Sequence, residues 1–183
     1  MHRQVNQFFI VFSVQKIAFS KIAANLRLNL KTDKLITNPE ISGKYGPLMI
    51  TVSTDKNKLN VPFIQIFLKD IYWAAGRTID EVQTTIDASF CFGIYLDNEQ
   101  IGFARVVTDY VVFAYLMDVF IDEKHRGKGY SSILIEAMMN EPQLQKVKIW
   151  RLATSDAHFL YEKFGFKQLA HPEKMMEKIV SGQ

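Results

Sequence analysis

The stretch VFIDEKHRGKGYSSILIEAMM, from Val119 to Met139, decides how the rest of the chain is interpreted. An apolar run suited to a strand leads into Gly127 and Gly129, which stand one residue apart among basic residues. The apolar side chains that follow recur at the spacing of one helix face: Tyr130, Ile133, Leu134, Ala137 and Met138. Glycines let a ligand approach the backbone closely, and the first turn of a helix offers unpaired N–H groups and the positive end of its dipole. The stretch therefore predicts a strand, a turn and a helix that together can bind phosphate.

The glycine pair fits neither of two common nucleotide-binding motifs. Gly127-Lys128-Gly129 lacks the Gly-Lys-Ser/Thr ending of a P-loop, and Ser132 occupies the third glycine position of a dinucleotide-binding G-x-G-x-x-G. The alternative is that the glycines only form a turn between a strand and a helix, beside a solvated basic edge. Residues elsewhere in the chain must decide between these interpretations.

The composition describes a globular chain without the charge of a nucleic-acid binder. Its 183 residues are 48% hydrophobic, which suffices for one domain of ordinary size plus an extension. Lys plus Arg number 22 against 19 for Asp plus Glu, and the resulting net charge of +3 is far from the basic footprint of a dedicated nucleic-acid binder. We therefore expect no nucleic-acid partner.

The cysteine count and the apolar runs bear on the compartment. A single cysteine, Cys91, excludes an intrachain disulfide and a cysteine-rich metal site, and its apolar surroundings, SFCFGIYL, favour a packed thiol. No uninterrupted apolar run approaches the ~20 residues that span a bilayer. Lys16 and Lys21 interrupt the apolar start of the chain, which argues against a secretory signal. We expect a cytoplasmic protein with no membrane anchor and no metal.

A turn-rich segment, TNPEISGKYGP, precedes the periodic part of the chain. Its prolines and glycines are typical of a linker, so we place a domain boundary near Met49. Residues 1–48 are interpreted as a dispensable N-terminal extension, either disordered or an artefact of an upstream start site. Residues 49–183 are then the functional domain, with MITVSTDKNKL as its first strand and turn.

The periodic part predicts an α/β fold of the α+β kind. Apolar residues recur at helical spacing from Ile64 to Ala75, and Thr78 with Glu81 forms a capping box that opens a second helix with Ile79 facing inward. FCFGIYLD and QIGFARVVTD, separated by the polar turn NE, predict an antiparallel hairpin, and FAYLMDVFID predicts the next strand. The helix after the glycines then leads to the strand KVKIWRLAT, which implies a right-handed crossover between two parallel strands.

Two motifs together resemble the GNAT superfamily of N-acetyltransferases. KHRGKG looks like the family's R/Q-x-x-G-x-G/A loop with Lys124 in place of Arg or Gln, and HFLYEKFGF is similar to its second signature, which contains Leu-Tyr-Glu-Lys-x-Gly-Phe. Both motifs stand in the right order and spacing, and the resemblance covers roughly residues 49–170. It implies a mixed, mostly antiparallel sheet with helices on both faces and a splayed pair of parallel strands.

The resemblance also implies a cofactor site for acetyl-CoA, as co-substrate, in the gap between the splayed strands. Its pyrophosphate would lie on backbone amides of the glycine loop, and its pantetheine arm would pair with the preceding strand like an extra strand. The residues implied to bind the cofactor are Val119, Phe120, Ile121, Arg126, Gly127, Lys128, Gly129, Tyr130 and Ser131. Thr154 replaces an Asn that is often found at the end of the second splayed strand, which puts one hydrogen bond in doubt.

For catalysis, the resemblance makes Tyr161 the general acid that protonates the departing thiolate. The alternative is a core tyrosine, because Tyr161 lies on an apolar helix stripe with Ala157, Leu160 and Phe164. Asp118 is the candidate base, since it shares a strand face with Leu116 and Phe120 and a carboxylate on an apolar face is either partnered or functional. A backbone amide of Val119 or a neighbour is a candidate to stabilise the oxyanion.

The acceptor is the least specified partner. In this family the first two helices and their connection wall the acceptor site, so Tyr72, Trp73 and Arg77 are candidates, with Arg77 as a clamp for a substrate carboxylate. The expected activity is transfer of an acetyl group from acetyl-CoA to a primary amine of a small molecule or protein, by direct attack in a ternary complex. The alternative is a non-catalytic acyl-CoA-binding or sensing module. The short tail after Phe166 leaves the last sheet edge truncated or completed by another chain, as in a homodimer.

Overall fold

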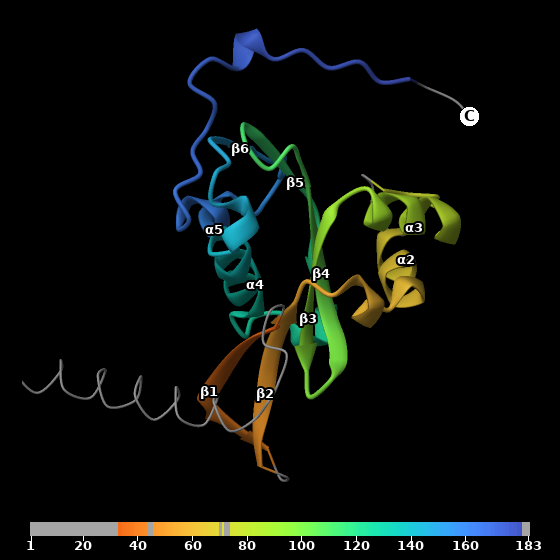
Figure 1. Ribbon diagram of the computed structural model, residues 1–183, viewed down its shortest axis with the longest axis vertical. Helices are drawn as coiled ribbons and strands as arrows, with labels where there is room; N and C mark the ends of the chain where they lie inside the picture. Colours follow the sequence, from red (N-terminus) through yellow and green to blue (C-terminus); the bar gives the residue numbers. More distant parts are fainter. Residues whose placement is uncertain (1–32, 44–45, 70, 72–73, 181–183) are drawn as a thin grey trace, which may run out of the picture. The chain divides into compact units, whose positions relative to one another are not determined.

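The computed structural model describes residues 33–43, 46–69, 71 and 74–180, which belong to one compact unit beginning at Asp33. A single six-stranded sheet runs through this unit, and its strands follow the order of the sequence (Figure 1). The strands are β1 Asp33–Gly43, β2 Gly46–Ser53, β3 Phe90–Leu96, β4 Glu99–Thr108, β5 Phe113–Ile121 and β6 Ile149–Arg151. The helices are α2 Val61–Lys69, α3 Ile79–Asp87, α4 Tyr130–Met139 and α5 His158–Glu162.

The sheet is mixed, as the sequence predicts. Neighbouring strands from β1 to β5 pair antiparallel, and β5 and β6 pair parallel. The parallel pair is joined through α4, so the predicted crossover is present. The predicted fold class is therefore confirmed, although β6 is shorter than the run KVKIWRLAT suggests.

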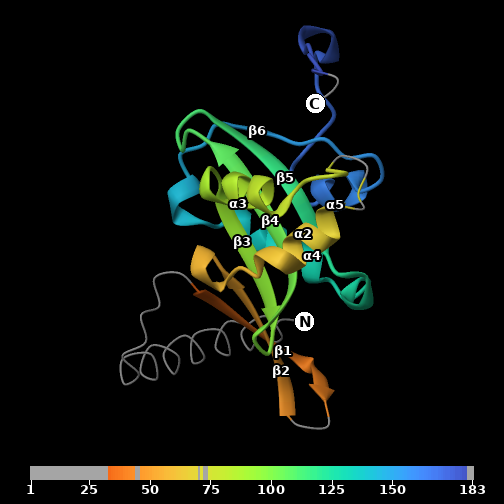
Figure 2. The same cartoon turned by 90° about the vertical axis from the view of Figure 1, so that its right-hand side faces the viewer.

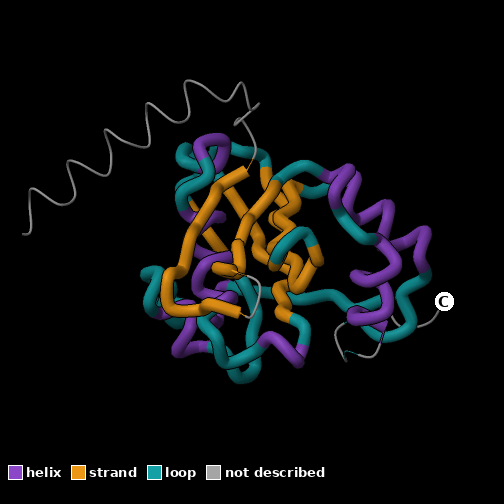
Figure 3. The backbone as a smooth tube through the Cα atoms, turned by 90° about the horizontal axis from the view of Figure 1, so that it is seen from below, coloured by secondary structure: helices purple, strands orange, loops and turns teal. Residues whose placement is uncertain are grey.

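Helices cover the sheet on both faces (Figures 2 and 3). Each face has its own apolar core. On one face α2 and α3 contribute buried side chains, among them Ile64 and Val82, that pack with Phe103 and Phe120 of the sheet. On the other face α4 and α5 pack against Ala104, Leu116 and other strand residues. These two cores fix the helices that surround the centre of the sheet.

Local signals in the sequence account for the ends of several elements. The predicted capping box is present, because the Thr78 hydroxyl accepts from the Glu81 amide and the Glu81 carboxylate accepts from the Thr78 amide. Ile79 does not face inward as predicted but is 47% exposed, since it stands in the first turn of α3.

Cys91 is buried, and burial raises the pKa of its thiol to about 11, so the predicted packed thiol is confirmed.

Strand β5 departs from regular pairing on both of its sides. Toward β4, Phe103 pairs with Phe120 and Arg105 with Met117, so Asp118 and Val119 together stand opposite the single residue between them. This is a β-bulge, and Asp118 carries a positive φ of 51° there. Toward β6, pairing in the described part of the chain covers only Phe113–Tyr115, after which the two strands separate.

The boundaries of the unit differ in part from the sequence interpretation. Strand β1 and the first residues of β2 precede Met49, so the sheet begins inside the segment that we interpreted as an extension. Whether residues 1–48 are dispensable stays a prediction. Residues 167–180 contain no strand, and within the described residues β6 pairs with β5 alone. Within the described chain, every helix is too short or too polar to cross a membrane.

The close packing of β4 against β5 predicts a large effect of one methyl group. A Cβ at Gly102 would lie 2.5 Å from the Phe120 carbonyl oxygen, which belongs to the backbone and cannot rotate away. We expect Gly102→Ala to lower the free energy of unfolding by ~1–3 kcal/mol, as overpacking does. Urea denaturation measures this as a lower midpoint with an unchanged slope.

Gly93→Ala on the neighbouring strand is the matched control. The three atoms nearest to a Cβ there belong to the outer end of the Tyr95 side chain and not to the backbone, so the loss should be smaller. Equal stability of Gly102→Ala and the unsubstituted protein would contradict this account of the β4–β5 contact.

Candidate active site

The glycine loop, the end of β5 and the start of α5 enclose a cavity of about 380 Å³. Eight of the nine residues that the sequence predicts for cofactor binding line it, namely Val119, Phe120, Ile121, Arg126, Gly127, Gly129, Tyr130 and Ser131. Lys128 does not line it. Phe67 and Ile71, from α2 and the residues after it, form part of the opposite wall. We call this space the loop cavity.

The loop conformation depends on glycine at two positions. Gly127 and Gly129 have φ values of 76° and 81°, in the left-handed region that favours glycine. An added Cβ at either position would meet no atom within 4 Å, so the space beside the loop is open. Gly129 is the N-cap of α4 and provides no side-chain cap, so the first N–H groups of the helix stay available to an anion. The loop can therefore hold a phosphate group.

The basic side chains of the loop are held by acidic and carbonyl partners. Lys124, which stands where the family has Arg or Gln, pairs with Glu99 at 3.1 Å and Asp122 at 3.4 Å, and these contacts raise its pKa. Arg126 donates from Nε to the Ile121 carbonyl at 3.1 Å and lies 5.9 Å from the centre of the Phe67 ring. Arg126 thereby joins the loop to the end of β5 and to α2.

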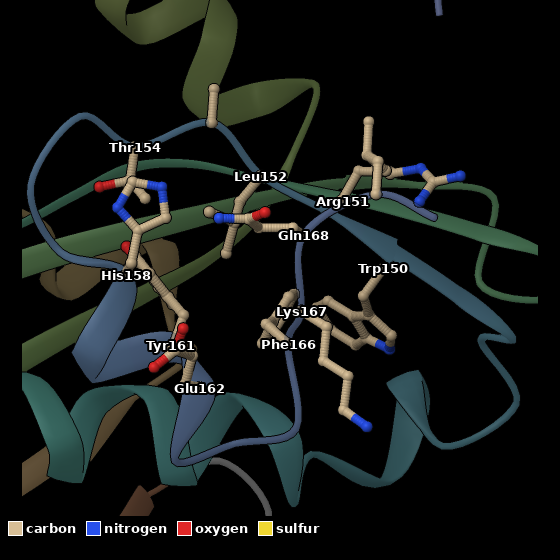
Figure 4. Close-up of a pocket in the computed structure, with 12 residues that line it drawn as sticks. Trp150, Arg151, Leu152, Thr154, His158, Tyr161, Glu162, Phe166, Lys167 and Gln168 are labelled. Carbon is tan, nitrogen blue, oxygen red and sulfur yellow. The ribbon is translucent and has the colours of Figure 1, made fainter. Parts of the chain in front are cut away.

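A second cavity of about 320 Å³ lies where β5 and β6 separate. It is lined by Tyr115 to Val119 of β5, by residues 153–157 after β6, and by Tyr161. We call it the splay cavity. It shares Val119, Asp156, Ala157 and Tyr161 with the loop cavity, so the two spaces meet beside these residues. A third cavity of about 250 Å³ lies between β6 and residues 166–169, and Tyr161 borders it as well (Figure 4).

Tyr161 is the side chain common to all three cavities. It is 8% exposed, and its ring packs edge-on against Phe166 at 5.9 Å between centres. Burial, and then the charge of Asp156, raise the pKa of the Tyr161 phenol to about 12. Because of this raised pKa, the phenol stays protonated at neutral pH. Among the described residues its hydroxyl has no hydrogen-bond partner, so it is free to donate to a bound group. Tyr161 also belongs to the apolar core, as the alternative interpretation of this residue predicts, and its role as the acid stays a prediction.

Asp118 and Arg77, predicted for different roles, contact each other. Asp118 Oδ2 accepts from Arg77 Nη1 at 2.8 Å and from Arg105 Nε at 2.5 Å, and Arg105 Nη1 also contacts Ser89 Oγ at 3.2 Å. The Asp118 side chain is fully buried, and its Oδ1 has no hydrogen-bond partner in the described part of the chain. The expectation that Asp118 shares a face with Leu116 and Phe120 is wrong, because the bulge sends Leu116 and Phe120 to different cores.

Several residues of the site escaped the sequence interpretation. Arg105 offered a signal, since it is a lone charge in the strand run QIGFARVVT. Asp156 lines both the loop and splay cavities and had no signal beyond its place before the Tyr161 helix. Thr154 is occupied, because its hydroxyl accepts from the Ala157 amide at 3.1 Å before α5. Tyr72 and Trp73 lie outside the described residues.

The titratable residues offer no metal site in the described chain. No group of three His, Cys, Asp or Glu side chains is placed there to hold a metal ion.

Comparisons with known proteins agree with this geometry. The family model of the "Acetyltransferase (GNAT) domain" matches residues 87–168. A protein of Gibberella zeae named "Putative acetyltransferase" is 31% identical over an alignment of 140 residues, and the match covers 63% of this chain and 78% of that protein. A crystal structure from Xanthomonas campestris pv. campestris, described as a "putative acetyltransferase belonging to the gnat family", is 45% identical with a TM-score of 0.69 and covers 72% of this chain and 93% of that one.

A more distant structure shares the fold. A predicted acetyltransferase from Clostridium acetobutylicum, solved with acetyl-CoA, is 14% identical with a TM-score of 0.55, over 72% of this chain and 96% of that one. The domain match and the two relatives above 30% identity define the class. The chain belongs to the GNAT family of acetyltransferases.

The environment of Tyr161 predicts its titration. Its folded-state pKa of about 12 exceeds the ordinary value of 10.0, so its phenol stabilises the fold fully below pH 10 and that contribution disappears as the pH rises toward 12. The tyrosinate absorbance of Tyr161 is obtained as the difference between the unsubstituted protein and Tyr161→Phe. We expect this difference to appear only near pH 12. Circular dichroism at each pH must show that the protein is still folded.

Asp156→Asn is the companion variant. It removes the negative charge that disfavours the tyrosinate, so the Tyr161 transition should move to lower pH. A Tyr161 transition near pH 10 in the unsubstituted protein would contradict this description of its surroundings.

Proposed function

We propose that this protein is an N-acetyltransferase that moves the acetyl group of acetyl-CoA to a primary amine of a small molecule or protein. The observation that carries the proposal is the position of Tyr161, whose protonated phenol borders both the loop cavity and the splay cavity. One cavity suits a phosphate-bearing cofactor, and the adjoining one leaves room for a second reactant. Both reactants can then be bound together, as direct attack in a ternary complex requires.

Acetyl-CoA fits the loop cavity by its chemistry. The positive-φ glycines and the start of α4 supply N–H groups for its pyrophosphate, from Arg126 to Ser131. Its pantetheine arm carries amides, and β5 beyond Tyr115 has no strand partner toward β6 in the described chain, so Val119 and Ile121 can pair with such an arm. The Clostridium acetobutylicum protein of the same fold, solved with acetyl-CoA, supports this assignment.

The reaction assigns a role to each group of the site. A neutral amine attacks the thioester carbonyl, the C–N bond forms, the C–S bond breaks, and the sulfur leaves as a thiolate. Tyr161 gives its proton to that thiolate, while the nitrogen loses one proton to a base. The sequence suggests Asp118 as that base, but its Oδ2 already accepts from two guanidinium groups. A backbone amide at the bulge, from Val119 or its neighbour, would stabilise the oxyanion.

An amine panel tests the function directly. Small amines, amino acids, polyamines and peptides with free N-termini or lysines are each incubated with acetyl-CoA. Release of CoA thiol is followed, and the products are identified by mass spectrometry. Acetylated amine formed at an enzyme-dependent rate supports the proposal. Tight acetyl-CoA binding without thiol release from any amine would favour the alternative, a non-catalytic acyl-CoA-binding or sensing module.

The glycine loop predicts a loss of cofactor affinity in Gly129→Val. A β-branched side chain disfavours the φ of 81° and adds bulk where the pyrophosphate must approach the backbone. We expect the acetyl-CoA dissociation constant, measured by calorimetry, to rise more than tenfold while the fold persists. Gly76→Val is the control, because Gly76 has a similar φ of 83° but lines none of the three cavities. Unchanged affinity in Gly129→Val would reduce the glycine pair to a structural turn.

The position of Tyr161 predicts a selective loss of turnover in Tyr161→Phe. Phenylalanine keeps the ring packing and deletes only the acid, so turnover should drop by roughly 10²- to 10⁴-fold while acetyl-CoA affinity barely moves. Because the hydroxyl lacks a hydrogen-bond partner in the described chain, thermal stability should also be unchanged. The control is Tyr110→Phe, at a 42% exposed tyrosine outside the three cavities. Full turnover of Tyr161→Phe on a confirmed substrate would refute the acid role.

A further inference from the structure

Three separate segments of the chain meet at the Asp118 carboxylate. Arg77 comes from the connection before α3, Arg105 from the middle of β4, and Asp118 from the bulge of β5. The side chains of Arg105 and Asp118 are 7% and 0% exposed, and that of Arg77 is 21% exposed. We call these three residues the bulge clamp. Asp118 borders the splay cavity, whereas neither guanidinium lines any of the three cavities, so the two arginines act from behind the site.

We propose that Asp118 is a positioning residue, and that its two ion pairs hold the β5 bulge and tie the connection before α3 to it. The proposal goes beyond the acetyl-transfer function, although its kinetic test rests on that function. It assigns the carboxylate to the geometry of Val119 and the cavity walls. This positioning role differs from the role of general base that the sequence suggested for Asp118.

The bulge needs such a hold, because its backbone conformation is unfavourable. A non-glycine residue with φ of 51° is uncommon, and Asp and Asn tolerate it better than most residues do. A carboxylate with 0% side-chain exposure is also costly unless it is paired. The positive φ and the buried charge therefore coincide at Asp118. The guanidinium of Arg105, at 2.5 Å, compensates the buried charge at the residue where the bulge forms.

The bulge determines which side chains line the loop cavity. If β5 lost the extra residue, the segment after Asp118 would slip by one position along β4, and every later side chain would change face. Val119, Phe120 and Ile121 all line the loop cavity, so a slip would dismantle one of its walls. The Arg105–Asp118 pair therefore acts on acetyl-CoA through the register of β5.

Arg77 has a separate effect, because it joins a different part of the site. Its carbonyl oxygen accepts from Gln65 Nε2 of α2 at 3.1 Å, and α2 supplies Phe67 to the loop cavity. The Arg77–Asp118 contact thus links the α2 wall and the connection before α3 to β5. With Arg77 removed, the Arg105 pair still holds the bulge, and only this wall is loosened.

The first test uses Asp118→Asn, which keeps the shape and the tolerance of positive φ but removes the charge. We expect amide hydrogen exchange in residues 116–121 to speed up at least tenfold and the acetyl-CoA dissociation constant to rise at least tenfold. A pure base role predicts the opposite pattern, in which turnover falls while exchange and acetyl-CoA affinity stay unchanged. That pattern would overturn the proposal.

The second test uses Arg77→Met and stays informative if Asp118→Asn fails to fold. Exchange should speed up in residues 74–78 and in α2, with residues 116–121 unaffected, and KM for the acceptor should rise more than kcat changes. Arg77→Lys, which retains the charge, should restore part of the difference. Two results would overturn the link to Asp118. One is amide exchange in residues 74–78 that Arg77→Met leaves unchanged. The other is an effect of Arg77→Met on this exchange that is the same in the Asp118→Asn variant as in the unsubstituted protein.

The exchange measurement separates this proposal from the proposed function. Accelerated exchange at the predicted amides in a protein that acetylates no amine would sustain the bulge clamp and reject the transferase. Unchanged exchange in a protein that acetylates an amine would reject the clamp and sustain the transferase.

Discussion

Strand β5 loses its neighbour on one side after Tyr115 and accommodates an extra residue on the other side at Asp118, and the whole site is arranged around these two breaks. A strand in the middle of a sheet normally forms hydrogen bonds with its backbone N–H and C=O groups to both neighbouring strands. Here the break toward β6 leaves part of β5 available to another molecule. The bulge turns the same stretch so that Val119 borders both the loop and splay cavities. In the proposed reaction, cofactor pairing and oxyanion stabilisation would thus both use one short run of backbone.

The charges behind the bulge explain why this irregularity persists in a well-packed sheet. Phe103 and Phe120 form the strand pair at one end of the bulge and pack with the helices α2 and α3, so a polar group there must be paired. The guanidinium groups of Arg77 and Arg105 pair with Oδ2 of Asp118, but Oδ1 has no partner among the described residues. A buried pair of this kind is weak evidence for stability in general, since desolvation opposes the attraction. Its value here lies in specifying the register of β5 over the regular alternative.

Local signals were enough for the parts of the fold that depend on neighbouring residues. The capping box at Thr78, the hairpin of β3 and β4, and the glycine loop before α4 all followed from residues within a few positions of one another. The bulge did not, because periodicity assumes a regular strand. The partners that hold it are distant, since Arg105 lies 13 positions and Arg77 lies 41 positions from Asp118 along the chain. Asp156 was missed for a different reason, since it lies close to Tyr161 along the chain but no sequence pattern marks a carboxylate in the segment before α5 as part of a site.

The surroundings of Tyr161 also constrain how the proposed reaction can proceed. A phenol with a pKa of about 12 is a weaker acid than a thiol, whose reference pKa is about 8.5, so complete proton transfer to a free thiolate is uphill by roughly 4–5 kcal/mol. The attacking amine changes this balance, because its nitrogen becomes positively charged as the C–N bond forms. That charge, next to the phenol, favours the tyrosinate and opposes the effect of Asp156. In the proposed reaction Tyr161 would therefore become an effective donor only when amine and thioester react together. This would couple the departure of the thiolate to acetyl transfer and disfavour it when the splay cavity is empty.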